Sequence, residues 1–411
     1  MSVCDRVEIW TKVGELIGTG PHLPLQLSSR NSYRRICKSN PQYSTSIPLW
    51  HPQSSAARTT AGNSLVTDRM MKSVLQSGWG GREQLSVGEV PRPVPKMGEV
   101  MVRVAAVSVN AGDHHALTGR PYLVRLALSG KKIPGMDFSG TVDRFEGIEQ
   151  TEYSEGDAVF GTVDVACGAF AEYVSVPAKF LSRKPQNVSW EEAAALPTAG
   201  MTALQALRTG GPVTKGNRVL INGASSGVGT FAVQLAKSMG AHVTGVCSGD
   251  NVEMVRSLGA DVVIDYRRED VLAASLLARM KYDKIIDAAG RTGWRRLLNP
   301  KGALVAVALP HPESECIPCE LCSLACSPYC CCCLSSKKSH PFMQSVKSAD
   351  MDELVQMVAD DKLRPVLGLR LAGINALPDA LAGHSSTLGQ GHRKGKTVVT
   401  LSVESESMDR E

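Results

Sequence analysis

The pattern of apolar and polar residues in the middle of the chain predicts a strand, a turn, a helix and a second strand. The continuous apolar run from Val219 to Ile221 is typical of a parallel strand buried on both faces. Beyond a glycine-rich turn, apolar residues return at helical spacing from Val228 to Met239, and Gly240 stands where a left-handed cap would end the helix. A second apolar run, His242 to Cys247, completes a β-α-β unit.

The turn of this unit is a candidate phosphate site. A strand, a glycine turn and a helix in this order aim the N–H groups of the helix N-terminus at one point, where the helix dipole also favours negative charge. Ala224 and Ser226 occupy the first two glycine positions of the G-x-G-x-x-G pattern, and Gly229 holds the third. The predicted cofactor-binding residues of the turn are Gly223, Ala224, Ser226, Gly227, Val228 and Gly229.

The same glycines also fit the spacing of short-chain dehydrogenases, G-x-x-x-G-x-G, counted from Gly223. That class needs a later Tyr-x-x-x-Lys pair, and no tyrosine of this chain has a lysine four residues on. Its glycine motif also normally opens the chain, whereas this one lies near the middle. The short-chain alternative is therefore disfavoured.

The regions on either side of the unit differ in pattern. From Met71 onward, short alternating runs separated by Gly and Pro predict a small β-rich domain. After the unit, the apolar runs in 282–290 and 302–310 predict two further parallel strands. The order is a β-rich domain first and a dinucleotide-binding unit second.

Composition and charge limit the function classes. The chain has 411 residues and a net charge of +5, enough length for two domains. Residues 1–69 hold eight Lys+Arg and four Asp+Glu, net +4, so the remainder is nearly neutral and no basic groove for nucleic acid is evident. No apolar run approaches the roughly 20 residues that a membrane helix needs, so a spanning segment is not expected.

Residues 1–69 are expected to be a disordered or targeting leader. No acidic residue lies between Leu16 and Thr67, and five basic residues are interspersed with Ser and Thr, which is typical of an organellar transit peptide. Composition does not separate mitochondrion from chloroplast. If translation instead starts at Met70 or Met71, a cytoplasmic location is expected.

Several motifs carry a resemblance to a known family. They are PGMDFSGTV at 134–142, EGDAVFG at 155–161, GAFAEYVSVP at 168–177, EEAAALPTAGMTALQAL at 191–207 and GHRKGKTVVTL at 391–401. With these motifs in this order, the chain resembles the medium-chain dehydrogenase/reductase superfamily, and within it the organellar, zinc-independent quinone oxidoreductases. The resemblance implies an α/β fold with a GroES-like β-rich catalytic domain and a doubly wound Rossmann domain.

The resemblance also implies a division of the chain. The expected parts are the catalytic domain at 70–196, the Rossmann domain at 197–340 with a Cys-rich insertion at 316–333, a return to the catalytic domain at 341–402, and a tail at 403–411. A homodimer is the common habit of the family.

The resemblance assigns roles to three residues of the first domain. Asn110 and Asp113 match the family's Asn-x-x-Asp beside the nicotinamide, so the Asn110 amide is expected to donate to a carbonyl of the acceptor, and Asp113 to fix local structure. His115 could supply a proton, but surface packing is its favoured role. Thr202 matches a family threonine near the cofactor.

The same match of motifs bears on zinc. The positions that hold zinc in the metal-dependent members are Asn110, Met136 and Thr198 here, and none of these is a competent zinc ligand. We therefore expect no metal, and chemistry that rests on the cofactor and on hydrogen bonds to the acceptor.

The end of the second strand bears on the choice of nicotinamide cofactor. It has no carboxylate to bind a ribose 2′-hydroxyl, whereas Ser248 could donate to a 2′-phosphate. Tyr266 matches a tyrosine that NADPH-using relatives place beside that phosphate. Asp250 weakens the case, so NADPH is favoured and NADH stays open.

Eight of the twelve cysteines lie between Cys316 and Cys333. Their first four have the spacing of a ferredoxin cluster, without the proline that should follow directly. The favoured interpretation is a variable apolar loop. The alternatives are an iron–sulfur or zinc site, redox sensing, and acylation that would give peripheral membrane association.

Together these observations predict an NADPH-dependent oxidoreductase that transfers hydride to a quinone or an α,β-unsaturated carbonyl without zinc. The alternative is a catalytically weak NADPH-binding scaffold that serves as an interaction protein.

Overall fold

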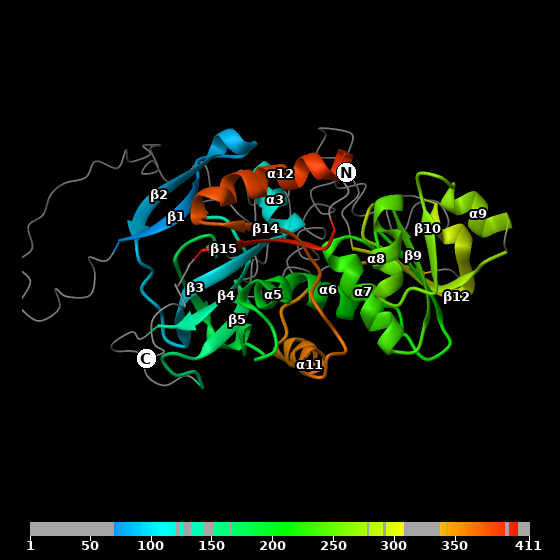
Figure 1. The fold of residues 1–411 in the computed structure, drawn as a ribbon, viewed down its shortest axis with the longest axis horizontal. Helices are drawn as coiled ribbons and strands as arrows, with labels where there is room; N and C mark the ends of the chain where they lie inside the picture. The colour runs from blue at the N-terminus through cyan, green and yellow to red at the C-terminus, as the bar shows by residue number, and fades with distance from the viewer. Residues whose placement is uncertain are drawn as a thin grey trace, which may run out of the picture. The chain divides into compact units, whose positions relative to one another are not determined.

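A computed structural model provides the fold (Figure 1). It describes residues 70–120, 124–125, 133–143, 152–163, 167–277, 279–290, 293–307, 338–342, 344–390 and 394–401. The leader at 1–69, the cysteine cluster and the tail at 403–411 lie outside the described residues. The predictions made for them stay predictions.

Six parallel strands form one sheet in the order β10-β9-β8-β11-β12-β13. Their bounds are Arg218–Asn222 for β8, His242–Cys247 for β9, Val262–Asp265 for β10, Tyr282–Asp287 for β11, Leu298–Ala306 for β12 and Lys338–Pro341 for β13. Numbered along the chain, this is the order 3-2-1-4-5-6 of a doubly wound sheet, so the predicted Rossmann fold is confirmed. The order reverses between β8 and β11.

Helices connect these strands, as right-handed crossovers require. They are α7 at Gly227–Ser238, α8 at Val252–Ser257 and α9 at Val271–Leu277. The helix predicted after the glycine turn is thus confirmed, and Gly240 adopts φ +80° directly beyond it.

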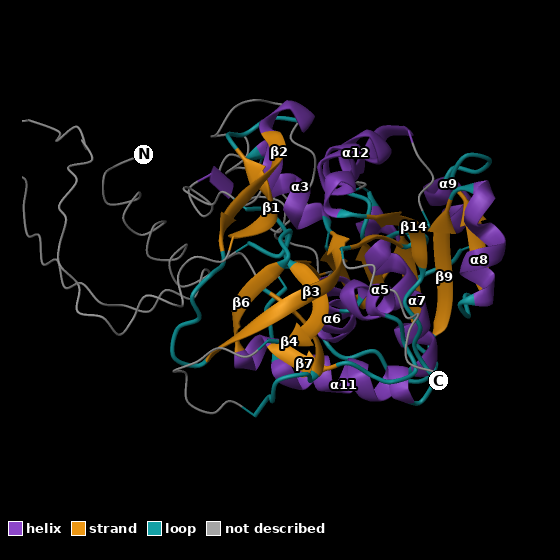
Figure 2. Cartoon of the chain, turned by 60° about the vertical axis from the view of Figure 1, so that its left-hand side comes forward, coloured by secondary structure: helices purple, strands orange, loops and turns teal. Residues whose placement is uncertain are grey.

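A second sheet contains strands from both ends of the described chain (Figure 2). Its order is β14-β15-β3-β4-β5-β7, with β6 also paired to β3. The bounds are Glu99–Val109 for β3, Asp137–Val142 for β4, Ala158–Thr162 for β5, Tyr173–Pro177 for β6, Leu181–Arg183 for β7, Leu367–Ala372 for β14 and Lys396–Thr400 for β15. Because β15 runs antiparallel to β3, with Val399 opposite Val107, residues near 400 complete the sheet that residues near 100 begin.

The first strands form a hairpin of β1, Met70–Gln76, and β2, Leu85–Pro91. The remaining helices are α3 at Ala111–Thr118, α5 at Trp190–Ala195, α6 at Pro197–Arg208, α11 at Ser348–Ala359 and α12 at Leu377–Gln390. α5 begins at a capping box in which Ser189 Oγ accepts from the Glu192 N–H and the Glu192 carboxylate accepts from the Ser189 N–H. This box fixes the start of the helix that precedes α6.

The hydrophobic core around α6 is shared by strands of both sheets. Phe160 on β5, Leu204 on α6 and Phe231 on α7 have no exposed surface and belong to one apolar cluster. Phe160 of the second sheet therefore contributes to the core that supports α7, the helix that follows the glycine turn.

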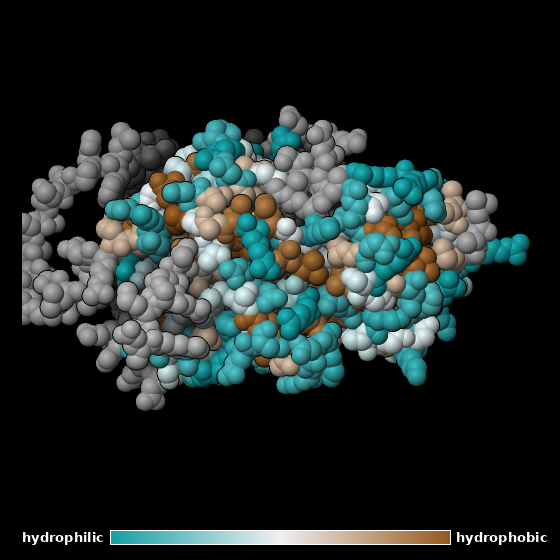
Figure 3. All heavy atoms as spheres, viewed as in Figure 1, coloured by the Kyte–Doolittle hydropathy of each residue, from teal (hydrophilic) through white to brown (hydrophobic). Residues whose placement is uncertain are grey.

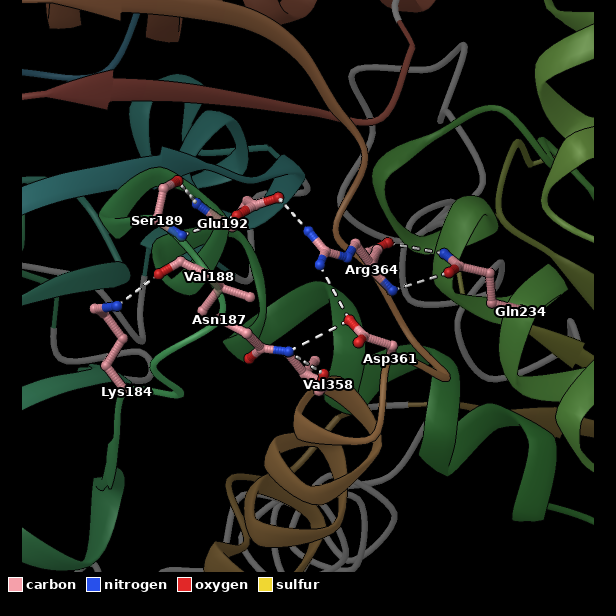
Figure 4. Close-up of polar contacts among 9 residues, drawn as sticks. All are labelled: Lys184, Asn187, Val188, Ser189, Glu192, Gln234, Val358, Asp361 and Arg364. Atoms are coloured by element: carbon pink, nitrogen blue, oxygen red, sulfur yellow. Dashed lines mark hydrogen bonds and ion pairs between the residues drawn. The ribbon is translucent and has the colours of Figure 1, made fainter.

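The segment that leads from α11 to β14 is held by polar contacts of Arg364 (Figure 4). The Arg364 N–H donates to Gln234 Oε1 on α7, and Gln234 Nε2 donates to the Arg364 carbonyl, both at 3.0 Å. The guanidinium also lies 3.0 Å from Asp361 and 3.9 Å from Glu192. Exposed ion pairs of this kind contribute little, so the two backbone hydrogen bonds carry most of the attachment.

A buried lysine ties β11 to the end of α6. Lys284 Nζ donates to the carbonyls of Leu207, Thr209 and Gly211, the first two at 2.7 and 2.8 Å. The three carbonyls belong to the last turn of α6, its C-cap and the turn that follows, so the ammonium binds the end of the helix. Burial lowers the pKa of Lys284 to about 8.

Within the described ranges, no helix is long and apolar enough to span a bilayer. Polar side chains cover much of the face seen in Figure 3, and apolar side chains reach it in separate patches.

The shared core predicts a large cost for removing the Phe160 ring. We expect Phe160→Ala to lower the free energy of unfolding by about 3–5 kcal/mol, because the substitution leaves a cavity in a fully buried site. Phe180→Ala, at a half-buried phenylalanine, is the matched control and should cost less than about 2 kcal/mol. Denaturant unfolding of both variants measures the difference, and equal losses would contradict the assignment of Phe160 to the shared core.

Candidate functional site: the glycine turn and a buried polar network

The glycine turn has the geometry of an anion site at the start of α7. Gly223 adopts φ +79°, and a Cβ at Gly229 would come 2.1 Å from the Gly223 carbonyl oxygen, so only glycine allows this close approach. Ser226 caps the helix, because its Oγ accepts from the Gly229 N–H at 3.0 Å. The N–H groups of Gly227 and Val228 have no acceptor inside the helix and remain for an anionic ligand.

Two other N–H groups of the turn are already used. Those of Gly223 and Ala224 both donate to the Val246 carbonyl of β9, at 3.1 and 2.9 Å. Ala224 itself is fully buried. The structure therefore places Ala224 in the wall of the turn, with its backbone bound to the neighbouring strand.

The strand order of the parallel sheet reverses beside this turn, between β8 and β11. Asn222 at the end of β8 donates from Nδ2 to Asp287 Oδ1 at the end of β11, at 2.7 Å. Asp287 Oδ1 also accepts from the N–H groups of Ala289 and Gly290. Ligands of doubly wound sheets bind outside the strand ends at such a switch point. The Asn222–Asp287 pair fixes the loops there.

The predicted residues for a 2′-phosphate lie at the ends of β9 and β10. Ser248 is buried and accepts from Asn251 Nδ2 at 3.1 Å. The Tyr266 N–H donates to the Cys247 carbonyl at 3.1 Å, which places Tyr266 next to Ser248, and its side chain is 41% exposed.

Next to them lies a pocket of about 470 Å³. It is lined by Tyr266, Arg267, Arg268, Glu269, Asp270, Val271, Leu272 and Trp294. Arg267 lies 3.4 Å from Asp250, and Arg268 lies 3.6 Å from Asp265. Both arginines are exposed on the surface, where such pairs exchange partners at little cost.

A buried polar network lies where β3 ends and α3 begins. Asn110 Nδ2 donates to Asp137 Oδ2 on β4 at 2.9 Å, and the Lys396 ammonium on β15 donates to Asn110 Oδ1. Thr198 on α6 donates from Oγ1 to Asp137 Oδ1 at 2.6 Å. The Lys396 and Asp137 side chains are only 3% and 0% exposed. Four elements thus meet through one amide and two buried charges.

Asp113 adds a second buried carboxyl group to this network. Its Oδ2 accepts from the Asn110 N–H at 2.8 Å, and its buried Oδ1 has no hydrogen-bond partner in the described part of the chain. Burial raises the pKa of Asp113 to about 7, the hydrogen bond from the Asn110 N–H opposes this, and Asp137 raises it further. Burial lowers the pKa of Lys396, while the two carboxylates act in the opposite direction.

The network and the glycine turn are in direct contact. The Gly395 N–H donates to the Ser225 carbonyl at 2.8 Å, and Gly395 forms a parallel bridge with Ser226. A Cβ at Gly227 would lie 2.8 Å from Lys396 Cδ. The stem of Lys396 therefore packs against the turn, while its ammonium reaches Asn110.

Two predicted site residues lie outside this network. His115 is half-buried on α3, with Nδ1 2.8 Å from the Arg120 carbonyl oxygen. Thr202 is buried in α6, one turn beyond Thr198. The structure thus brings Asn110 and Asp113 together, and it places His115 on another face of α3.

The donor atoms do not fit a zinc ion. The three positions that would hold zinc supply an amide, a thioether and a hydroxyl, from Asn110, Met136 and Thr198. The amide and the hydroxyl are already bound to Asp137. Over the described residues, no group of three or more His, Cys, Asp or Glu is arranged to hold a metal ion.

The sequence analysis missed Lys396, Asp137 and the capping role of Ser226. The signal for Lys396 is a lysine that opens an apolar strand, KTVVT, where it must find a partner if buried. Asp137 gives the same kind of signal at the start of β4.

Comparisons with known proteins agree with this geometry. Residues 96–186 match the alcohol dehydrogenase GroES-like domain family, and residues 227–328 match the zinc-binding dehydrogenase family. The chain is 32% identical over 346 residues to the chloroplastic quinone-oxidoreductase QR1 of Triphysaria versicolor, covering 81% of this chain and 99% of that one. It is 31% identical to the mitochondrial NAD(P)H oxidoreductase RTN4IP1 of Bos taurus, covering 74% and 82%.

A solved structure shows the same fold. The quinone oxidoreductase from Coxiella burnetii superposes with a TM-score of 0.69 at 27% identity, and the match covers 81% of this chain and all of that one. Both sheets are therefore shared with an experimentally determined relative.

The raised pKa of Asp113 predicts a pH-dependent stability. Its folded pKa of about 7 lies above the ordinary value of 3.8, so the folded state binds the proton more tightly. The resulting stabilisation is full below about pH 4 and is lost as the pH rises through about 7, with a slope of at most about 1.4 kcal/mol per pH unit. Denaturant unfolding between about pH 4 and 8 should show this slope in the wild type and not in Asp113→Asn. The same slope in both proteins would contradict the assignment.

Proposed function

Because the chain belongs to the medium-chain dehydrogenase/reductase superfamily of oxidoreductases, we propose that it transfers hydride from NADPH to a quinone or an α,β-unsaturated carbonyl compound without zinc. The observation that carries the proposal is the Asn110 amide, held between Asp137 and Lys396, whose stem packs against the glycine turn. Both acceptor classes have a carbonyl oxygen that becomes negative as hydride is added.

An amide N–H is the group that such an oxygen needs. Asn110 Nδ2 uses one N–H on Asp137, and among the residues that the structure describes the second has no acceptor. A donor fixed before the reaction stabilises an oxyanion without having to reorganise, and in many enzymes this stabilisation contributes more to catalysis than any other single effect. Asn110 therefore orients the acceptor and stabilises its developing charge.

The same network supports chemistry without a metal. The amide, thioether and hydroxyl at the three positions that would hold zinc are poor zinc ligands. The Asp137 carboxylate is neutralised by Lys396 and is not left to bind a cation. Quinones and enones are electrophilic enough to accept hydride with hydrogen-bond assistance alone. Alcohol oxidation, which uses a Lewis acid to acidify the alcohol, is less suited to this site.

Ser248 and Tyr266 at the ends of β9 and β10 support NADPH as the hydride donor, with the Asp265 carboxylate of β10 paired to Arg268. When bound, NADPH supplies the hydride, and the N–H groups of Gly227 and Val228 bind its pyrophosphate. Ser248 and Tyr266 lie where a 2′-phosphate would bind, with Arg267 adjacent. We further propose that residues 1–69 direct the protein to an organelle, as with the chloroplastic and mitochondrial relatives.

Turnover by variants of Asn110 tests the proposal. We expect the wild type to oxidise NADPH with a quinone or a 2-alkenal, and Asn110→Ala to lower kcat by about 10²–10³, because an oxyanion donor is lost. NADPH affinity, followed by nicotinamide fluorescence, should stay within about twofold. Asn299→Ala is the matched control. Asn299 also donates to an aspartate, Asp283, but at the N-terminal ends of β11 and β12, opposite the strand ends beside the glycine turn.

Two outcomes would count against this function. Unchanged kcat in Asn110→Ala would remove Asn110 from the reaction. Tight NADPH binding without turnover on any quinone or enone would favour the scaffold alternative.

The cofactor assignment predicts a charge effect at Ser248. We expect Ser248→Asp to raise the Kd for NADPH at least about tenfold, equivalent to about 1.4 kcal/mol, because a carboxylate would repel the 2′-phosphate. NADH, which lacks that phosphate, should bind at least as well as before. Ser257→Asp on the exposed end of α8 adds the same charge away from the strand end and should leave both affinities unchanged. Equal weakening of both cofactors in Ser248→Asp would contradict the assignment.

A further inference from the structure

Two charges of opposite sign fix the orientation of the Asn110 amide. The Lys396 ammonium has only donors, so it can bind only the amide oxygen, and the Asp137 carboxylate accepts from the amide nitrogen. Rotation of the amide by 180° would set NH₂ against NH₃⁺ and oxygen against carboxylate. For many Asn side chains the assignment of the amide oxygen and nitrogen is ambiguous. Here the two charges exclude the rotated orientation.

The position of Lys396 is itself fixed from the cofactor side. Its stem packs against Gly227, and the preceding residue, Gly395, is bound to Ser225 and bridged to Ser226. A second hydrogen bond runs from Lys396 Nζ to the Val109 carbonyl at 3.2 Å. The ammonium is therefore held between the glycine turn and the residue that precedes Asn110.

The charge balance makes Lys396 important for the whole network. Asp137 and Asp113 both face it, and both are fully buried, as is Lys396 apart from 4% of its surface. Without the ammonium, two carboxylates would share a site with no cation, and one would have to be protonated or the site would open. The Asn110 amide would then be free to turn its oxygen toward the acceptor.

We propose that Lys396 is a positioning residue for hydride transfer: it holds the Asn110 amide with one N–H toward the acceptor and places a buried positive charge behind that N–H. This inference rests on the proposed function. Lys396 touches neither hydride nor acceptor carbon, so it acts through Asn110. Its loss should therefore lower kcat much more than it changes the KM for NADPH.

A double-mutant cycle tests the role. We expect Lys396→Met to lower kcat at least about tenfold with NADPH affinity retained, and to have no further effect in the Asn110→Ala background. Lys396→Gln, whose amide can still donate to Asn110 Oδ1, should retain more activity than Lys396→Met. Lys284→Met is the matched control: it also removes a buried lysine, but one that binds only backbone carbonyls away from Asn110, so it should lower Tm and leave kcat within about twofold.

Several results would overturn the proposal. One is an unchanged kcat in Lys396→Met. Another is a double variant whose loss of kcat equals the product of the two single losses. A third is that both Lys396 variants fail to fold and to bind NADPH, which would assign the lysine to stability.

A measurement without turnover separates this proposal from the proposed function. The side-chain amide of Asn110, identified in ¹⁵N-labelled protein by its loss in Asn110→Ala, should give two proton signals that lie further apart than those of a solvent-exposed amide, since one N–H is bound to a carboxylate. Lys396→Met should shift or merge them, whereas an unchanged pair would refute the positioning role. This holds even if no acceptor is ever reduced, a result that would sink the proposed function alone.

Discussion

Two opposite charges, on Asp137 and Lys396, lie buried 3.9 Å apart, and the arrangement of the site depends on them. Charges taken out of water are costly unless hydrogen bonds complete their solvation. Here Thr198 and Asn110 supply those bonds to the carboxylate, and the Val109 carbonyl and Asn110 supply them to the ammonium. The partners come from α6 and from the junction of β3 and α3, while the charges lie on β4 and β15, so all of these elements must be in place before both charges are satisfied.

The glycine turn and the polar network, the two parts of the site, are built in opposite ways. The glycine turn depends on the lack of side chains, since a single Cβ at Gly229 would collide with the Gly223 carbonyl. The polar network depends on buried side chains that bind one another. They meet at Gly395 and Lys396, where the backbone binds the turn and the side chain binds the network. The proposed cofactor and acceptor sites thus share one wall.

The sequence was informative where a short segment determines its own structure. The apolar run at Val219, the helical spacing that follows it and the cap at Gly240 all predict elements that the structure contains. Asn110 could be named only through family resemblance, because a loop asparagine is usually a turn former. Lys396 could not be found at all, since its role depends on Asp137 and Asn110, which no local pattern connects to it. The same holds for the N–H of Ala224, which pairs with a neighbouring strand further along the chain.

The contact between Lys396 and Asn110 joins residues 286 positions apart in the chain. Contacts of such long range form late, because the entropy of closing the intervening chain must be overcome first. The parallel sheet and its glycine turn, built from neighbouring segments, can therefore take shape while the acceptor site is still incomplete. Until β15 docks on β3, the Asn110 amide lacks the ammonium that fixes its orientation.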